Sequence, residues 1–167
     1  APGPGQPMSH TAEGWPERHE AAEIIGRSPH CLEAPRVVYL PRTPGGGWAP
    51  PPPGDPLPGD LAMTTTMDGR EVPNSVRWER GVINRFIYSV AMLDSAPALD
   101  GSPQGADWNG RLLYHFQGGV AIGHTQGSPS GSRMLYHDAL KLGYGVIYST
   151  GTKTGTHYDL ELGGETA

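Results

Sequence analysis

Cysteine is almost absent from this chain of 167 residues, because Cys31 is its only thiol. No disulfide can therefore form within the chain. A small buried thiol and a bridge to a cysteine on another polypeptide are the two interpretations left open for Cys31. Catalysis by Cys31 is disfavoured, since no histidine-bearing partner motif lies near it in the sequence.

Charge is also scarce: charged side chains make up 17% of the chain, and the net charge is -5. The 12 lysines and arginines are scattered singly, which argues against nucleic acid as a partner. No apolar run approaches the roughly 18 residues that a membrane helix needs, so no membrane is expected as a partner. The seven histidines show no HExxH spacing, and the sequence predicts neither a metal site nor a cofactor.

The first five residues show no basic segment followed by an apolar core, so they do not look like a signal peptide. An alanine at position 1 is what cleavage after a small-residue site leaves behind. We therefore expect a secreted or periplasmic protein.

Glycine and proline are abundant, at 25 and 18 residues, and much of the proline precedes Leu61. This distribution predicts a loop-rich segment over residues 1–60 and a folded domain over 61–167. Within the first segment, Arg36–Leu40 is apolar and β-branched and predicts one strand. Glu17–Ile25 predicts a short helix with its alanines and isoleucines facing inward.

A hairpin is predicted at the start of the folded domain. Asp68-Gly69 is a turn signal, and residues 76–79 alternate as a half-buried strand does. Gly81 marks a second predicted turn. Val82–Leu93 is rich in β-branched and aromatic residues, which predicts a long strand.

The pattern then changes to that of a βαβ unit. In order, the predicted parts are a strand over 111–116, a Gly-rich loop over 117–131, a helix over 133–142 and a buried strand over 144–150. Ser132 is the expected N-cap, and Gly143 suits the position just past the helix end. The expected apolar face of the helix comprises Met134, Leu135, Asp138, Ala139 and Leu142. An antiparallel hairpin followed by a βαβ unit is the opening of an α/β-hydrolase sheet, so the fold class predicted is α/β, as an incomplete α/β-hydrolase fold.

The loop after the first strand of this unit is the main candidate for chemistry. It leaves the carboxyl end of a parallel strand, where α/β sheets place their sites. Adjacent glycines let backbone N–H groups approach a ligand, and in an α/β-hydrolase this loop supplies one oxyanion-hole donor. The predicted catalytic groups are the backbone N–H groups of Gln117, Gly118, Gly119 and Val120. The alternative is a Gly-rich turn with no functional role.

A second loop, over residues 150–156, also leaves the carboxyl end of a strand. It does not match the G-x-x-x-x-G-K-[ST] phosphate loop. We expect it to line the substrate cleft. The predicted substrate-binding residues are His115, Thr150, Thr152 and Thr156.

Residues 60–93 resemble the front of an uncharacterised bacterial family placed among the α/β-hydrolases. The resemblance continues through residues 108–112, the Gly118-Gly119 loop, residues 142–146 and residues 165–167. The later part is also similar to tannase and feruloyl esterase enzymes, which share a Gly-Gly loop, a helix and a following Gly-Tyr strand. The resemblance implies a secreted serine hydrolase that cleaves esters, with amides as an open alternative, through an acyl-enzyme.

The chain departs from that family in lacking the G-x-S-x-G elbow. The nearest string, residues 127–131, has Pro129 where the serine should stand. Since the triad order is Ser, then Asp or Glu, then His, the other two members are not expected either. We therefore expect a second polypeptide to carry the rest of the fold and the catalytic triad. Two other hypotheses stay open: the small subunit of a two-chain N-terminal-nucleophile amidase or acylase, and a non-catalytic secreted binding module.

Overall fold

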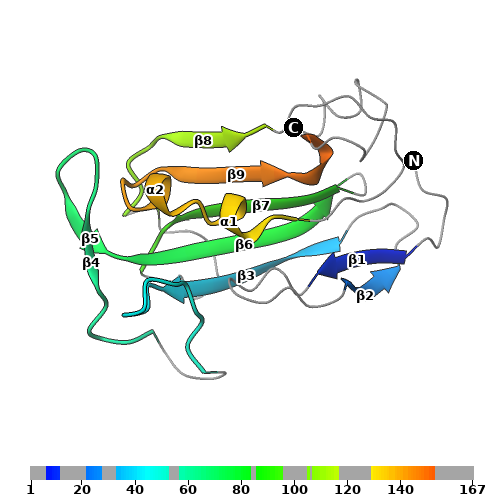
Figure 1. Cartoon of the computed structure of the whole chain (residues 1–167), viewed down its shortest axis with the longest axis horizontal. Helices are drawn as coiled ribbons and strands as arrows, with labels where there is room; N and C mark the ends of the chain where they lie inside the picture. Colours follow the sequence, from blue (N-terminus) through cyan, green and yellow to red (C-terminus); the bar gives the residue numbers. More distant parts are fainter. Residues whose placement is uncertain are drawn as a thin grey trace.

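The computed structural model describes residues 7–11, 22–27, 33–52, 57–83, 86–95, 105, 107–116 and 129–152. Its centre is a mixed five-stranded sheet in the order β3-β6-β7-β9-β8 (Figure 1). Together with two short helices, this sheet confirms an α/β fold. No helix among the described residues is long and apolar enough to cross a membrane.

The antiparallel part of the sheet contains β3 (Glu33–Pro41), β6 (Ser75–Ile83) and β7 (Phe86–Leu93). All three pair antiparallel, and β7 then pairs antiparallel with β9 (Gly145–Ser149). The strand predicted over 36–40 is confirmed as part of β3. The predicted turn at Gly81 is wrong, because Gly81 lies inside β6 opposite Tyr88. The predicted long strand over 82–93 is divided between the end of β6 and β7, since Ile83 pairs with Phe86.

Two small hairpins flank the sheet. The strands β1 (Pro7–Thr11) and β2 (Ala22–Arg27) pair antiparallel. The helix predicted over 17–25 is therefore wrong for its second half, which is β2, while residues 17–21 lie outside the described residues. Strand pairing outweighs the helix propensity of this segment, which is too short to be stable as an isolated helix.

The hairpin predicted around Asp68-Gly69 is confirmed. It consists of β4 (Met63–Thr65) and β5 (Glu71–Pro73), joined by a tight turn. Gly69 has a φ of 81°, in the left-handed region, and its N–H donates to the Thr66 carbonyl at 2.9 Å. The turn needs glycine there because a side chain would be strained at that φ.

The predicted βαβ unit is also confirmed. The strands β8 (Leu112–His115) and β9 pair parallel, and α1 (Gly131–Met134) and α2 (His137–Leu140) lie in the connection between them. A 3₁₀ turn, η2 (Thr150–Thr152), follows β9. In Figure 1 both parallel strands point the same way, and both helices lie over one face of the sheet.

The connecting helix differs from the prediction of a single helix over 133–142. The chain leaves helical geometry at Leu135 and Tyr136, where Tyr136 has an extended ψ of 99°. The break changes which residues face the sheet: Leu140 is fully buried, whereas Asp138 and Leu142 are exposed. The N-cap of α1 is Ser130 rather than the predicted Ser132, and no side-chain cap bond is formed. Gly143 has a φ of 88° and ends the second turn as predicted.

The core lies between the helices and the face of the sheet that we call the helix face. Strand alternation places Leu40, Val76, Trp78, Ala91 and Val146 on this face. They pack with the buried residues of the connection, which are Met134, Leu135, Ala139 and Leu140. The carboxyl ends of β8 and β9 lie together at one end of the sheet because these two strands pair parallel.

Trp48 adds a loop to the same core. It is buried, and the Arg42 guanidinium lies 4.9 Å from its ring centroid. His137 meets the same ring edge-on, with ring centroids 5.9 Å apart. The loop that follows β3 is thereby fixed against α2.

Candidate functional site

The carboxyl ends of β8 and β9 lie side by side at one edge of the sheet. The register pairs His115 with Tyr148, one residue before Phe116 ends the described part of that segment. His115, near the described end of this segment, therefore lies beside the last part of β9, shortly before the turn η2. Adjacent carboxyl ends of parallel strands are where α/β folds bind ligands.

The predicted oxyanion residues Gln117, Gly118, Gly119 and Val120 lie outside the described residues, as does Thr156. The structure does place the end of β8, the strand that precedes these residues in the sequence. The position of those N–H groups stays a prediction.

His115 lies half-buried at the end of β8. Its pairing with Tyr148 places it on the helix face, because paired residues share a face of the sheet. Ser149, the next residue along β9, is on the opposite face. His115 and Ser149 therefore do not form a nucleophile–base pair.

Thr150 and Thr152 lie in η2, directly after β9. The Thr150 side chain is fully buried, and its Oγ1 accepts a hydrogen bond from the Ile87 N–H at 3.0 Å. Thr152 is half-buried and its hydroxyl donates to the Ser149 carbonyl at 3.0 Å. Thr150 thus ties the turn to β7, while Thr152 lies closer to the surface.

Two further side chains meet at this edge, on the opposite face. Burial raises the pKa of Tyr114, and a hydrogen bond with the Ser149 side chain opposes that rise. The Ser149 Oγ also accepts from the Gly151 N–H at 3.1 Å. The ring centroids of Tyr114 and Phe116 are 4.4 Å apart, and Phe116 is 65% exposed. The sequence analysis did not single out Tyr114, Phe116 or Ser149; alternation along the strand could have grouped Tyr114 with Phe116, whereas Ser149 joins them only through the β8–β9 register.

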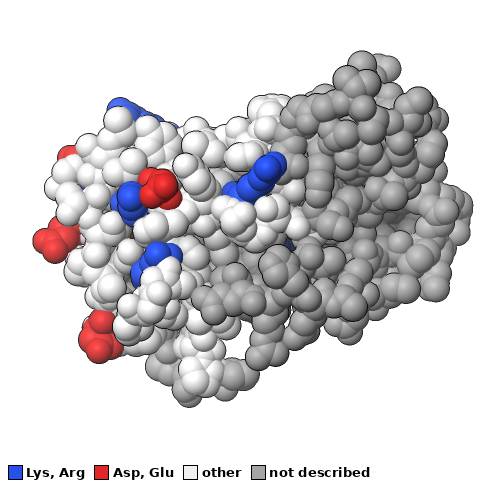
Figure 2. Space-filling view, in the orientation of Figure 1, with Lys and Arg blue, Asp and Glu red and all other residues white. Residues whose placement is uncertain are grey.

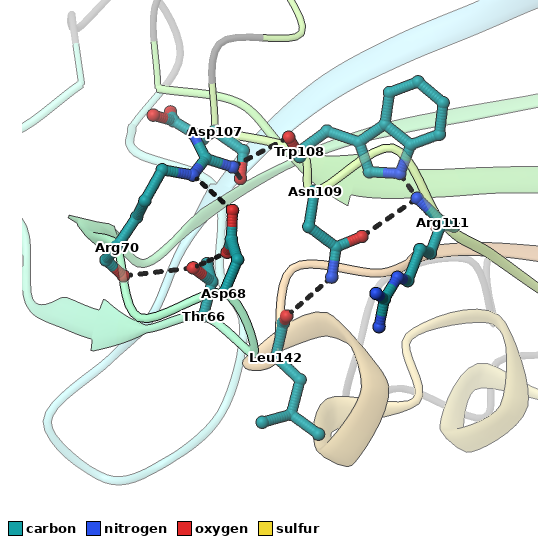
Figure 3. A network of polar contacts seen from close by, with 8 residues as sticks. All are labelled: Thr66, Asp68, Arg70, Asp107, Trp108, Asn109, Arg111 and Leu142. Atoms are coloured by element: carbon teal, nitrogen blue, oxygen red, sulfur yellow. Dashed lines mark hydrogen bonds and ion pairs between the residues drawn. The ribbon is translucent and has the colours of Figure 1, made fainter.

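A polar network supports the other end of the same two strands (Figure 3). The Arg70 Nε donates to Asp68 Oδ2 at 2.8 Å, and its Nη2 donates to the Trp108 carbonyl at 2.9 Å. The Thr66 hydroxyl also donates to Asp68. The hydrogen bonds from Thr66 and from Arg70 lower the pKa of the Asp68 carboxyl. The β4–β5 turn is thereby attached to the segment that leads into β8.

Asn109 connects that segment to the end of the α2 turn. Its Nδ2 donates to the Leu142 carbonyl at 2.9 Å, and its Oδ1 accepts from the Arg111 N–H at 2.9 Å. The Gly145 N–H donates to the Arg111 carbonyl at 2.8 Å, which starts the β8–β9 pairing. Residues 108–112 and 142–146 both belong to the family resemblance described above, and they contact each other in the structure. Their hydrogen bonds set the register of the parallel pair.

The described charges on the face drawn in Figure 2 form no patch of one sign. On the face drawn in Figure 2, blue and red side chains alternate over the described part of the surface. Among the described residues, no group of three or more His, Cys, Asp or Glu side chains could hold a metal ion.

Comparison with known protein families gives a match over most of the chain. Residues 14–167 match a family described as a tannase-like family of unknown function (DUF6351). No curated protein and no solved structure matches the chain.

Proposed function

The chain belongs to this tannase-like family, and from that membership we propose that it is the N-terminal chain of a secreted or periplasmic serine hydrolase. The reaction proposed is cleavage of ester bonds, and by extension amide bonds, through an acyl-enzyme. The observation that supports it most directly is the parallel β8–β9 pair, whose predicted Gly-Gly loop leaves the carboxyl end of β8.

The role proposed for this chain is electrostatic. Backbone N–H groups among Gln117, Gly118, Gly119 and Val120 stabilise the negative charge on the acyl oxygen in the transition state. A donor of this kind contributes about 3 kcal/mol to transition-state stabilisation. His115, Thr152 and Thr156 are proposed to lie along the bound acyl compound, whereas Thr150, which was predicted to bind substrate, is fully buried and holds the turn in place.

The nucleophile is proposed to come from a second polypeptide. The sequence contains no G-x-S-x-G elbow, and in the described residues His115 and Ser149 lie on different faces of the sheet. The strand β8 ends the order of the described sheet. A strand added beside β8 would place a nucleophile elbow next to the oxyanion loop, as α/β-hydrolases require.

Proline substitution tests the loop directly, because proline has no backbone N–H. We expect Gly119→Pro or Val120→Pro to lower the acylation rate of the assembled enzyme by about 10²–10³-fold. The measurement is the rate of p-nitrophenyl ester hydrolysis together with labelling of the serine by a fluorophosphonate.

The matched control is Val120→Ala, which changes the side chain and keeps the N–H. It should leave acylation within a few-fold of the parent rate. Equal rates for Val120→Pro, Gly119→Pro and the parent would refute the oxyanion role. Fluorophosphonate labelling of a partner's N-terminal residue instead of an internal serine would favour the amidase alternative.

A further inference from the structure

Arg80 is a buried cation with an unsatisfied nitrogen. Arg80 is 7% exposed, and its Nη1 has no hydrogen-bond partner. The guanidinium lies over the Trp78 ring, 4.5 Å from the centroid. Burial, followed by the charge of Arg36, lowers the pKa of Arg80 to about 10. Removing a cation from water is costly unless an opposite charge offsets it.

Arg36 adds a second positive charge at the same place. It pairs with Arg80 in the antiparallel β3–β6 ladder, so both side chains leave the helix face of the sheet side by side. Like charges directly opposite each other in a ladder are destabilising. Arg36 is exposed, so this pair runs from the surface inward to Arg80.

The nearest described carboxylate on β6 does not neutralise this pair. Glu79 is on the opposite face of the sheet, where it accepts from Arg77 at 3.0 Å and from the Tyr88 hydroxyl at 3.0 Å. The Trp78 indole, which lies under Arg80, donates to Ser89 at 2.7 Å and offers no acceptor. The guanidinium groups of Arg36 and Arg80 are on the same face of the sheet. Among the described residues, no carboxylate forms an ion pair or hydrogen bond with Arg80.

We propose that Arg36 and Arg80 form a binding site for a small carboxylate. Guanidinium groups match the planar carboxylate with paired N–H donors, and the free Nη1 of Arg80 supplies one of them. A carboxylate carries a single charge, so moving it beside the buried Arg80 costs less than moving a phosphate dianion there.

The site is separate from the proposed oxyanion loop. The ladder runs from Arg80 through Ser89 and Tyr148 to His115, which is three strand spacings, or about 14 Å. Carboxylate binding can therefore be measured without any hydrolysis, and its failure would leave the proposed function untouched.

Acetate is the probe, added to the full chain against sodium chloride of equal ionic strength. The Trp78 indole N–H signal in a ¹H–¹⁵N spectrum reports on the site, and thermal unfolding reports on binding. We expect a saturable shift of that signal and a rise in Tm, because a ligand that binds only the folded state stabilises it.

Arg36→Gln, at an exposed position, should weaken acetate binding by about tenfold. Arg80→Met should abolish it and raise the Tm without acetate, since replacing a buried charge by an apolar group is often stabilising. Lys141→Gln removes an exposed lysine that pairs with Asp138, and should leave binding unchanged.

An absent or non-saturable acetate response would overturn the proposal, as would a response that Arg36→Gln leaves unchanged. Tighter binding of inorganic phosphate than of acetate would overturn the carboxylate assignment. If Arg80→Met fails to fold, the comparison of Arg36→Gln with Lys141→Gln decides the outcome alone.

Discussion

Gly81 shows how one residue makes a strand pairing possible. A Cβ at this position would lie 2.6 Å from the Tyr88 ring, whose hydroxyl donates to Glu79. The ring thus covers the glycine within the β6–β7 ladder. The sequence analysis interpreted Gly81 as a turn signal, whereas its role is to admit the Tyr88 ring.

We expect Gly81→Ala to destabilise the fold by about 1–3 kcal/mol, because it overpacks a site closed by a hydrogen-bonded ring. Urea unfolding gives the free energy. Gly59→Ala is the control, since a Cβ at Gly59 meets nothing within 4 Å. The destabilisation caused by Gly81→Ala should be smaller in a protein that also carries Tyr88→Ala. If the free-energy changes of the two substitutions simply add, this explanation is contradicted.

His137 predicts a dependence of stability on pH. Burial lowers the pKa of His137, Arg42 and Lys141 lower it further, and Asp138 acts in the opposite direction. The folded state therefore binds fewer protons than the unfolded state below about pH 6.5, the unfolded value. It follows that the free energy of unfolding decreases as the pH falls from 6.5 through the lowered pKa.

His137→Phe keeps a ring against Trp48 and cannot be protonated. We expect the variant to lose less stability than the parent between neutral and mildly acidic pH. Denaturant midpoints at the two pH values measure this difference. An equal loss in both proteins would show that His137 does not contribute to the acid sensitivity.

At the scale of elements, the register of β8 and β9 depends on contacts at their starts. Asn109 satisfies the Arg111 N–H and the Leu142 carbonyl, and both belong to the connections that begin the parallel pair. Parallel strands have no hairpin turn to fix their register, so such contacts have to do so.

Asn109→Ala should cost about 0.5–1.5 kcal/mol, because it removes the acceptor of the Arg111 N–H, while the Leu142 carbonyl still accepts from the Met67 N–H. Amide hydrogen exchange should speed up at Arg111 and Gly145, at the start of the pair. Asn109→Asp is the matched variant, since it keeps the acceptor for Arg111 and loses the donor to Leu142. Unchanged exchange at both amides in Asn109→Ala would contradict a role in register.

The helical connection illustrates a limit of sequence patterns at this scale. A 3.6-residue pattern fitted one helix over 133–142, but the chain forms two single turns with a break at Tyr136. Helices this short gain little from their own hydrogen bonds, so packing on the sheet decides their shape. The periodicity predicted burial of Met134, Leu135 and Ala139 correctly, wrongly included the exposed Asp138 and Leu142, and did not include the buried Leu140.

At the scale of the whole molecule, the proposed function requires a nucleophile elbow that these 167 residues do not contain, and we propose that a partner polypeptide carries it. The strand β8 is last in the described sheet, and Leu112, on that strand, is 55% exposed. We expect the protein purified from its source to show two polypeptides by mass spectrometry under denaturing conditions. Under native conditions it should show a single species with the summed mass.

A single mass equal to that of this chain under both conditions would favour the non-catalytic binding module. A single larger mass under denaturing conditions would show that the elbow lies on the same polypeptide. The catalytic proposal would then survive and the two-chain arrangement would not.

The sequence by itself determined the βαβ unit, the β4–β5 turn and the strand in β3, since apolar periodicity and glycine positions are local properties. Only the tertiary structure decided that Gly81 lies within a strand, that Ala22–Ile25 pair as a strand and that the connecting helix breaks. It also decided that Arg36 and Arg80 stand side by side, because they meet through a ladder between segments 44 residues apart in number (80 less 36). Contacts between distant segments depend on register and burial, and neither can be read from a local pattern.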